Sequence, residues 1–463
     1  MALIRDRDFM NEDGTIPMQL ITKCIEEHQK EVGERLSILK NYYDGKHKIL
    51  DRTLSTPSLP NNKIVCNHAE YITDMAVGYV FGAPITYSGD NTDYLNEVFT
   101  EIEEDSYNNE LALDTSIYGY GLEFNYMSTD AVPVPKLATI SPLNGFLVVD
   151  NTVEHKPMFA VSYYDKYKID GTKDGYTVSV YTDKKIFKYS TQMLANTQFN
   201  LVSEEEHFFA DVPVIEYKNN KQCKGDFEGV IPLIDAYNLL QSDRVNDKEQ
   251  VVDALLAVIG ASLGDDEEEK IKTGKLLKEL KIIELDEGGD AKWLVKNLNE
   301  TEIEVLKKSL KDDIHEFSKV PCLTDENFVG NASGVAMKYK LLGFEQLGIT
   351  KERYFKQGLR QRLKLISNVE NIRAKGIDPT QIDIKFKRTL PVDEELAARI
   401  AQETDGFISW ETRIKRFDGE IDVEEERKRL EEENKKKVED QQKMFGSYDF
   451  KNTNQEDGEV DEE

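Results

Sequence analysis

Apolar side chains recur every three to four positions along much of the chain, which is the period of an amphipathic α-helix. This pattern predicts a helix over residues 19–43 and another over residues 64–81. The second of these ends before Pro84, because the residue before a proline avoids helical angles. Residues 92–118 predict a further helical region, which is closed by the sequence Tyr-Gly-Tyr-Gly.

Runs of β-branched and aromatic residues follow, and turn residues separate them. They predict a meander of three antiparallel strands, at Met158–Tyr164, Tyr176–Tyr181 and Lys185–Tyr189. Residues 212–217 predict another strand. Residues 382–386 alternate between apolar and charged side chains, which is the pattern of a half-exposed strand.

A long helix is predicted to begin at Pro232 and to run to Ile259. Proline suits the first turn of a helix. Its two ends are apolar, but Val245 is the only apolar residue between Gln241 and Gln250. A helix that is polar on all sides does not bury itself in an ordinary core. The middle of this helix therefore needs polar contacts with partner helices, or it borders solvent.

Residues 260–300 predict a small α/β insertion, after which a second helix begins. The spacing of Thr301 and Glu304 matches a capping box, and Pro321 ends the helix. One apolar face of the helix is predicted to contain Ile303, Leu306, Leu310, Ile314 and Phe317.

Residues 322–334 predict a loop, and the helical pattern resumes from 335 to about 375 with Gly343 and Gly348 as weak points. The C-terminal part predicts helices near 393–404, 409–417 and 422–445. Residues 446–463 have no apolar periodicity and are expected to be disordered.

The charge of the chain argues against a tight nucleic-acid binder. Its 463 residues include 59 Lys and Arg and 88 Asp and Glu, for a net charge of −29. Proteins that grip DNA neutralise its phosphates with Lys and Arg. An excess of carboxylates is compatible instead with a surface past which DNA moves without sticking. No run of about 18 apolar residues occurs, so we expect no membrane helix and no membrane partner.

No motif for catalysis or metal binding is evident. Thr273-Gly274-Lys275-Leu276 lacks the first glycine and the final Ser or Thr of a phosphate-binding loop. The four cysteines and six histidines are not spaced as metal ligands, and each histidine is interpreted as a surface or satisfied core residue. The acidic run 265–269 is better explained as a solvated turn than as a metal site. We expect no enzymatic activity, catalytic residue, metal or cofactor, although a carboxylate pair could be hidden among the many acidic residues.

The order of these parts resembles that of the portal proteins of tailed bacteriophages, of the siphophage type from Gram-positive hosts. The resemblance extends from about residue 15 to 440. Its most specific stretches are 212–246, which includes PVIEYKNN and GDFEGVIPLIDAYNLLQSDRVN, 325–342, DENFVGNASGVAMKYKLL, and 408–430, ISWETRIKRFDGEIDVEEERKRL. None of the three is a catalytic signature.

The resemblance implies an α+β, mainly helical fold with wing, stem, clip and crown regions. The implied regions are the wing at 1–228, the first stem helix at 229–260, the clip at 261–300, the second stem helix at 301–320, a tunnel loop at 321–334, a long wing helix, strand and return helix at 335–404, the crown at 405–445, and a disordered acidic tail at 446–463.

The resemblance also implies a homo-oligomeric ring, commonly of twelve subunits, at one capsid vertex of the virion. Such a ring is assembled in the host cytoplasm and serves DNA packaging, head–tail joining and DNA ejection. The implied partners are the terminase large subunit, a head–tail adaptor, the major capsid and scaffolding proteins, and the double-stranded DNA that passes through the channel.

On this interpretation the tunnel loop faces DNA. Its amide and hydroxyl groups can contact phosphates, whereas its carboxylates repel them, and its glycines give the backbone freedom. A plain surface connector is the alternative. The candidate residues are Asp325, Glu326, Asn327, Phe328, Asn331 and Ser333 with Gly330 and Gly334 in the loop, and Gln241, Asp243, Arg244, Asn246 and Lys248 as channel or subunit contacts in the first stem helix.

Two other classes of function stay open at this point. Another phage structural protein, such as a head–tail adaptor or a scaffold-like protein, could share the acidic and helical composition, but would lack two long helices that bracket an insertion. A DNA-processing enzyme would require a nucleotide or metal motif. Images of purified rings with a central hole would favour the portal interpretation over both.

Overall fold

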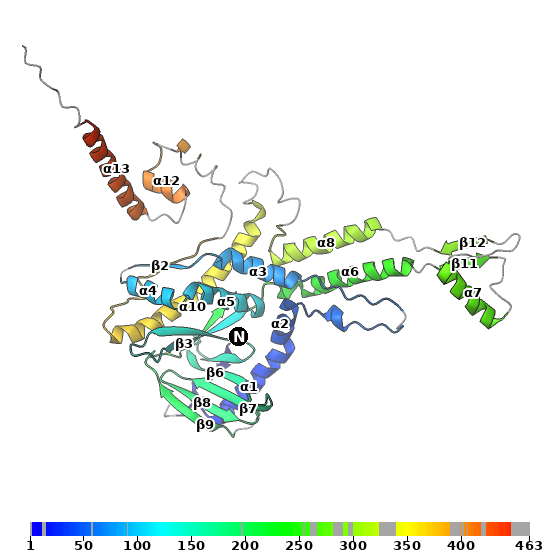
Figure 1. Cartoon of the computed structure of the whole chain (residues 1–463). Coiled ribbons are helices and arrows are strands. Elements are labelled where there is room, and N and C mark those ends of the chain that lie inside the picture. Colours follow the sequence, from blue (N-terminus) through cyan, green and yellow to red (C-terminus); the bar gives the residue numbers. More distant parts are fainter. Residues whose placement is uncertain are drawn as a thin grey trace, which may run out of the picture. The chain divides into compact units, whose positions relative to one another are not determined.

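The computed structural model divides the chain into two compact units, residues 1–389 and residues 390–463 (Figure 1). Both units contain helices, and the strands among the described residues belong to the first. The structure describes residues 2–11, 15–56, 59–89, 91–195, 198–252, 255–259, 266–280, 290–294, 300–323, 339–388, 399, 402–404, 406–417 and 423–445.

A six-stranded sheet in the order β1-β5-β6-β7-β8-β9 forms one layer of the first unit. β1 pairs with β5 in parallel, and the other neighbours are antiparallel. Ile21 and Ile25 of α1 (Met18–Glu31) are buried in one apolar cluster with Phe159 of the sheet. The predicted three-strand meander is confirmed as part of this sheet, whose strands are β1 Leu3–Arg5, β5 Gly145–Asp150, β6 Pro157–Tyr167, β7 Lys173–Tyr181, β8 Lys185–Thr191 and β9 Asn200–Glu206.

A second, larger core lies between the antiparallel sheet β10-β3-β4 and three helices. Leu111 of α5, Tyr217 of β10 and Leu359 of α10 are buried in it. α10 lies so close to β10 that a methyl group on Gly358 would collide with the Tyr217 ring. The elements are α3 His68–Phe81, α5 Glu104–Tyr118, β3 Tyr120–Met127, β4 Pro135–Ile140, β10 Val214–Lys218 and α10 Leu342–Ile372. The helix predicted at 64–81 and the strand predicted at 212–217 are thus confirmed, within a few residues at their ends.

A buried charge network ties α10 to this core. The Arg362 side chain is 0% exposed and donates hydrogen bonds to Glu123 (3.0 Å), to Asn108 (2.9 Å) and to Glu104. Its partners belong to α5 and β3, so three elements meet at one guanidinium group. A charge is tolerated in a core only when it is paired and hydrogen-bonded in this way.

The predicted N-terminal helices are confirmed, with one interruption each. A π-helical turn, Val32–Leu36, separates α1 from α2 (Ser37–Tyr43). The region 92–118 divides at Glu103, whose φ of 53° is left-handed, into α4 (Asp93–Glu101) and α5. The shorter elements are the 3-10 turns Arg7–Phe9, Lys48–Asp51 and Glu228–Val230, and the antiparallel pair β2 Thr86–Ser88 and β13 Asp383–Lys385, which confirms the half-exposed strand.

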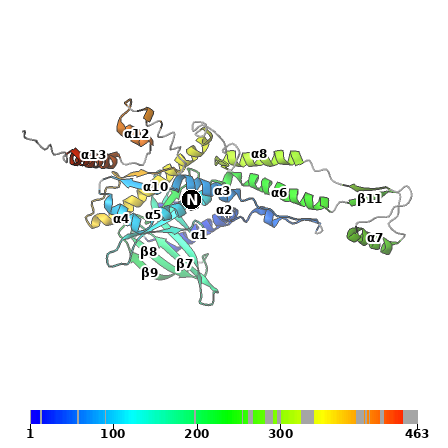
Figure 2. The same cartoon turned by 45° about the horizontal axis from the view of Figure 1, so that its top comes forward.

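Two long helices, α6 (Ile231–Val252) and α8 (Glu300–Ser318), lie side by side in both views (Figures 1 and 2). The prediction that the first helix runs to Ile259 is wrong. Residues Leu255–Ile259 form β11, which pairs antiparallel with β12 (Asp290–Leu294). Five consecutive apolar residues fit a buried helix or a strand equally well. They form a strand because residues 290–294 pair with them.

The insertion contains one described helix, α7 (Glu267–Leu280), between β11 and β12 in the sequence, and is α/β as predicted. The helix cap predicted at Thr301 is wrong, because α8 already includes Glu300. A turn at Leu341 interrupts the helix predicted from 335 onward, and α10 then begins at Leu342 and continues through Gly343 and Gly348. The predicted helical residues 335–338 lie outside the described residues.

The second unit has two described helices, α12 (Trp410–Phe417) and α13 (Val423–Phe445). They confirm the helices predicted at 409–417 and 422–445. Most of the helix predicted at 393–404 and the whole acidic tail lie outside the described residues.

Candidate functional site: the paired helices α6 and α8

Ion pairs connect the C-terminal half of α6 to the N-terminal half of α8. Arg244 lies 2.6 Å from Glu304 and 3.4 Å from Glu300, and Lys248 lies 3.1 Å from Glu300. All four side chains are partly exposed, so each pair contributes only about 0–1 kcal/mol. These contacts fix which faces of the two helices meet, rather than holding the pair together strongly.

The extended segment 61–66 lies along another face of α6 and explains much of its polar character. The backbone N–H groups of Asn62, Ile64 and Cys66 donate in turn to the side-chain oxygens of Asn246 (2.8 Å), Ser242 (3.0 Å) and Asn238 (2.8 Å). Four helical residues span about 6 Å, and two extended residues span about 6.6 Å. The helix thus offers acceptors at nearly the spacing at which the segment presents donors.

The five α6 residues that the sequence singled out all have partners within this chain. Beyond Arg244, Lys248 and Asn246, the Gln241 amide donates to the Tyr237 hydroxyl (3.0 Å), and Asp243 lies 2.6 Å from Arg52. Whether the five also face a channel or a neighbouring subunit stays a prediction. Asn238 and Ser242, which with Asn246 form this ladder of acceptors, were missed, although the three residues follow one another at intervals of four in the sequence.

The predicted apolar face of α8 is only partly covered. Ile314 is fully buried in the core, but Leu306 is 50% exposed and Phe317 66% exposed. On α6, Leu239 is also exposed. Exposed apolar side chains mark a contact with another molecule where they form a contiguous patch, whereas single ones are common on any protein surface.

A buried ion pair connects α10 to the turn that leads into α6. The Lys351 ammonium group donates to Asp226 and to Asn219, both at 2.6 Å, and Lys351 and Asp226 are almost completely buried. Asp226 precedes α6 by five residues, so α10 and the start of α6 are held at one point.

The chain matches the family described as phage portal protein, SPP1 Gp6-like, over residues 21–440. It belongs to this portal protein family. The portal protein of Clostridium phage phiCD119 is 26% identical over 421 residues, which cover 86% of this chain and 92% of that protein. The portal protein of Bacillus phage SPP1 is 25% identical over 453 residues, which cover 89% of this chain and 86% of that protein. A chain from the neck of an empty gene transfer agent particle aligns over 75% of this chain and 89% of its own length, at a TM-score of 0.45 and 12% identity.

Family membership confirms the predicted fold class, α+β with the portal architecture. It does not test individual residues. The loop residues Asp325, Glu326, Asn327, Phe328, Gly330, Asn331, Ser333 and Gly334 all lie outside the described residues. Their assignment to a DNA-facing loop of this portal-family chain stays a prediction.

The described part of this portal-family chain contains no group of three or more His, Cys, Asp or Glu side chains placed to hold a metal ion. Gly274 and Lys275 lie inside helix α7, not in a loop between a strand and a helix, so they cannot cradle a phosphate as a phosphate-binding loop does. His28 is a satisfied core residue: its ring nitrogens contact the Tyr163 hydroxyl (2.8 Å) and the Pro142 carbonyl (3.0 Å). Across the described residues, every helix is too short or too polar to cross a membrane.

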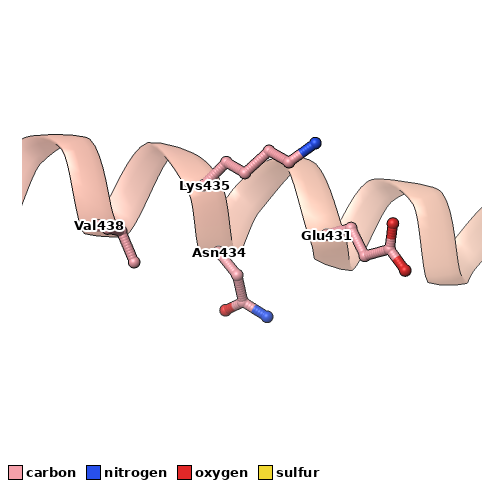
Figure 3. Close-up of a pocket in the computed structure, with 4 residues that line it drawn as sticks. All are labelled: Glu431, Asn434, Lys435 and Val438. Carbon is pink, nitrogen blue, oxygen red and sulfur yellow. The ribbon is translucent and has the colours of Figure 1, made fainter.

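A shallow hollow lies on the surface of α13, in the second unit (Figure 3). Glu431, Asn434, Lys435 and Val438 line it, and all four come from this single helix. One exposed helix face cannot enclose a small molecule as a binding pocket does, so we assign no ligand to it.

Proposed function

We propose that this chain forms the ring-shaped channel at one capsid vertex, through which double-stranded DNA is packaged and ejected and at which head and tail are joined. Membership of the portal protein family supports this function, and so do two relatives named as portal proteins. The observation that carries it in this chain is the helix pair α6–α8, whose apolar residues Leu239, Leu306 and Phe317 remain exposed. Identical subunits packed side by side and closed into a ring would cover such residues in every copy.

We propose the following regions for each subunit of the ring. The wing is residues 1–228 with 335–404, the two stem helices are α6 and α8, and the crown is residues 405–445. The clip lies between the stem helices. Because Leu255–Ile259 pairs with the strand at 290–294, we propose that the clip begins at Leu255 and not at residue 261.

The net charge of −29 favours a channel that lets DNA move through it over a surface that binds DNA tightly. Lys and Arg contacts to the phosphates release the counterions of DNA and hold DNA of any sequence to the protein. A carboxylate-rich surface repels the phosphates and keeps the DNA mobile. On this proposal the chain has no active site of its own, and the energy for packaging comes from a separate motor.

The proposed partners are eleven further copies of the chain, the terminase large subunit during packaging, a head–tail adaptor afterwards, and the major capsid and scaffolding proteins around the ring. The assembled protein would lie in the virion, after assembly in the host cytoplasm. The clip is the proposed contact for the motor and the adaptor, because it is inserted between the two stem helices in the chain.

Electron microscopy and mass measurement of the purified full-length chain test the ring. We expect rings with a central hole, whose yield rises with salt because subunits of charge −29 repel each other at low ionic strength. Monomers at every ionic strength would overturn the proposal. ATP and DNA hydrolysis should both be absent, and activity that copurifies with the ring would contradict the lack of an active site.

A matched pair of variants tests the role of the stem. Leu306→Asp should weaken assembly by about tenfold or more, because it removes a leucine from the interface and buries a charge. Ile169→Asp adds the same charge at a fully exposed position between β6 and β7, and should leave ring yield unchanged. Equal ring yields for the two variants would show that Leu306 is not at the subunit interface.

A further inference from the structure

Helix α3 contacts the chain on both sides of residues 324–338. The described chain stops at Leu323, after α8, and resumes at Tyr339, just before α10. Two tyrosines of α3 account for these contacts, Tyr71 on the first side and Tyr79 on the second. They are eight residues apart, which corresponds to about 12 Å along the helix.

Tyr71 holds the segment that leaves α8. Its hydroxyl donates to the Pro321 carbonyl (3.2 Å) and accepts from the Leu323 backbone N–H (3.1 Å). Burial raises the pKa of Tyr71, so the hydroxyl keeps the proton that it donates. The Tyr71 ring also meets the ring of His315 edge-on, at 5.6 Å between centroids, and a His315 ring nitrogen contacts the Val320 carbonyl (2.9 Å). The turn after α8 is thus held by side chains from two helices.

Tyr79 holds the segment that enters α10. Its ring stacks on Phe344 at 4.3 Å between centroids, with 24° between the planes, and its hydroxyl donates to the Glu345 carboxylate. Gly348 allows this closeness, because a methyl group there would lie 3.2 Å from the Tyr79 ring. The Arg388 guanidinium group also lies over the Tyr79 ring, 5.7 Å from its centroid, and is 3.4 Å from the Glu345 carboxylate.

We infer that α3 is the platform that positions residues 321–323 and the first turn of α10 relative to each other, with Tyr71 and Tyr79 as positioning residues. The inference rests on the proposed function, in which residues 321–334 are the part of the channel that meets DNA. α3 is rigid because most of its residues are buried in the larger core. Two attachments on one rigid helix fix the distance between residues 321–323 and the first turn of α10, and any movement of α3 shifts both together.

Hydrogen–deuterium exchange of the full-length protein tests the platform. Tyr71→Phe keeps the aromatic ring and removes both hydrogen bonds of the hydroxyl. Exchange in residues 318–323 should become about fivefold to tenfold faster, the effect of losing one to two partly buried hydrogen bonds. Tyr79→Phe should have the corresponding effect on residues 342–348. Tyr43→Phe is the matched control, because it removes a tyrosine hydrogen bond to Asp74 of the same helix (3.2 Å), away from both ends.

Unchanged exchange at residues 318–323 in Tyr71→Phe would overturn the inference. Faster exchange spread over the six-stranded sheet would also overturn it, because the tyrosine would then support the whole body of the protein. Packaging assays separate the inference from the proposed function. If Tyr71→Phe exchanges faster locally, forms rings and packages DNA less efficiently than Tyr43→Phe, both stand. If it exchanges faster locally and packages DNA normally, the platform stands and the role of the loop in packaging is refuted.

Discussion

Removing the buried guanidinium group of Arg362 should destabilise the first unit more than almost any other single change. In Arg362→Met, a side chain of similar length replaces the cation, and Glu104 and Glu123 stay in the core without their partner. Both carboxylates are almost completely buried. Loss of one partner from a buried ion pair typically costs about 3–5 kcal/mol, chiefly because a buried charge is left uncompensated.

The neighbouring residue Lys364 provides the control on the same helix. Its ammonium group lies 3.1 Å from Asp211, but the Lys364 side chain is mostly exposed. Lys364→Met removes the same charge from α10 and should cost only about 0–1 kcal/mol, as exposed ion pairs do.

Urea unfolding of the full-length chain at pH 7, followed by circular dichroism, measures both variants. The reasoning requires that the free energy of unfolding falls by at least about 2 kcal/mol more in Arg362→Met than in Lys364→Met, with similar dependence on urea in both. Equal losses would refute it, because the buried network would then contribute no more than a surface pair.

Three further results are expected. Gly358→Ala should lower the free energy of unfolding by about 1–3 kcal/mol, and with it the midpoint of thermal unfolding, because the added methyl group collides with the Tyr217 ring of β10. In Gly343→Ala, on the same helix, the methyl group meets nothing within 4 Å, so this variant should be neutral or slightly stabilising. Burial raises the pKa of Asp114 to about 7, so wild-type stability should fall as pH rises from about 4 to about 7; Asp114→Asn should remove this loss and raise the melting temperature at pH 8 but not at pH 4. Asn238→Ala frees the backbone N–H of Cys66 and should speed alkylation of that thiol, measured by mass spectrometry; an unchanged rate would show that the ladder does not hold segment 61–66.

Local periodicity was enough to determine most of the elements. The helices at 19–43, 64–81 and 409–417 and the strand meander at 158–189 needed only the spacing of apolar residues and the turn residues between them. The order of the parts also indicated the portal family, because that order reflects the whole chain and not any one motif. The sequence also placed α8, since its apolar residues have a clear helical period, but of that predicted face Ile314 alone is fully buried.

The tertiary structure decided whatever depended on a partner distant in sequence. Leu255–Ile259 is a strand because 290–294 lies beside it, and no local pattern contains that pairing. The polar middle of α6 predicted polar contacts with partner helices or a border with solvent. Within the chain it binds segment 61–66, which precedes it by some 180 residues and was not predicted. Arg362 is an ordinary charged residue of an amphipathic helix in the sequence, and it became a core residue because two carboxylates from α5 and β3 converge on it. Periodicity reports which face of an element is apolar, whereas burial of a charge, pairing of a strand and attachment of a loop depend on groups that only folding brings together.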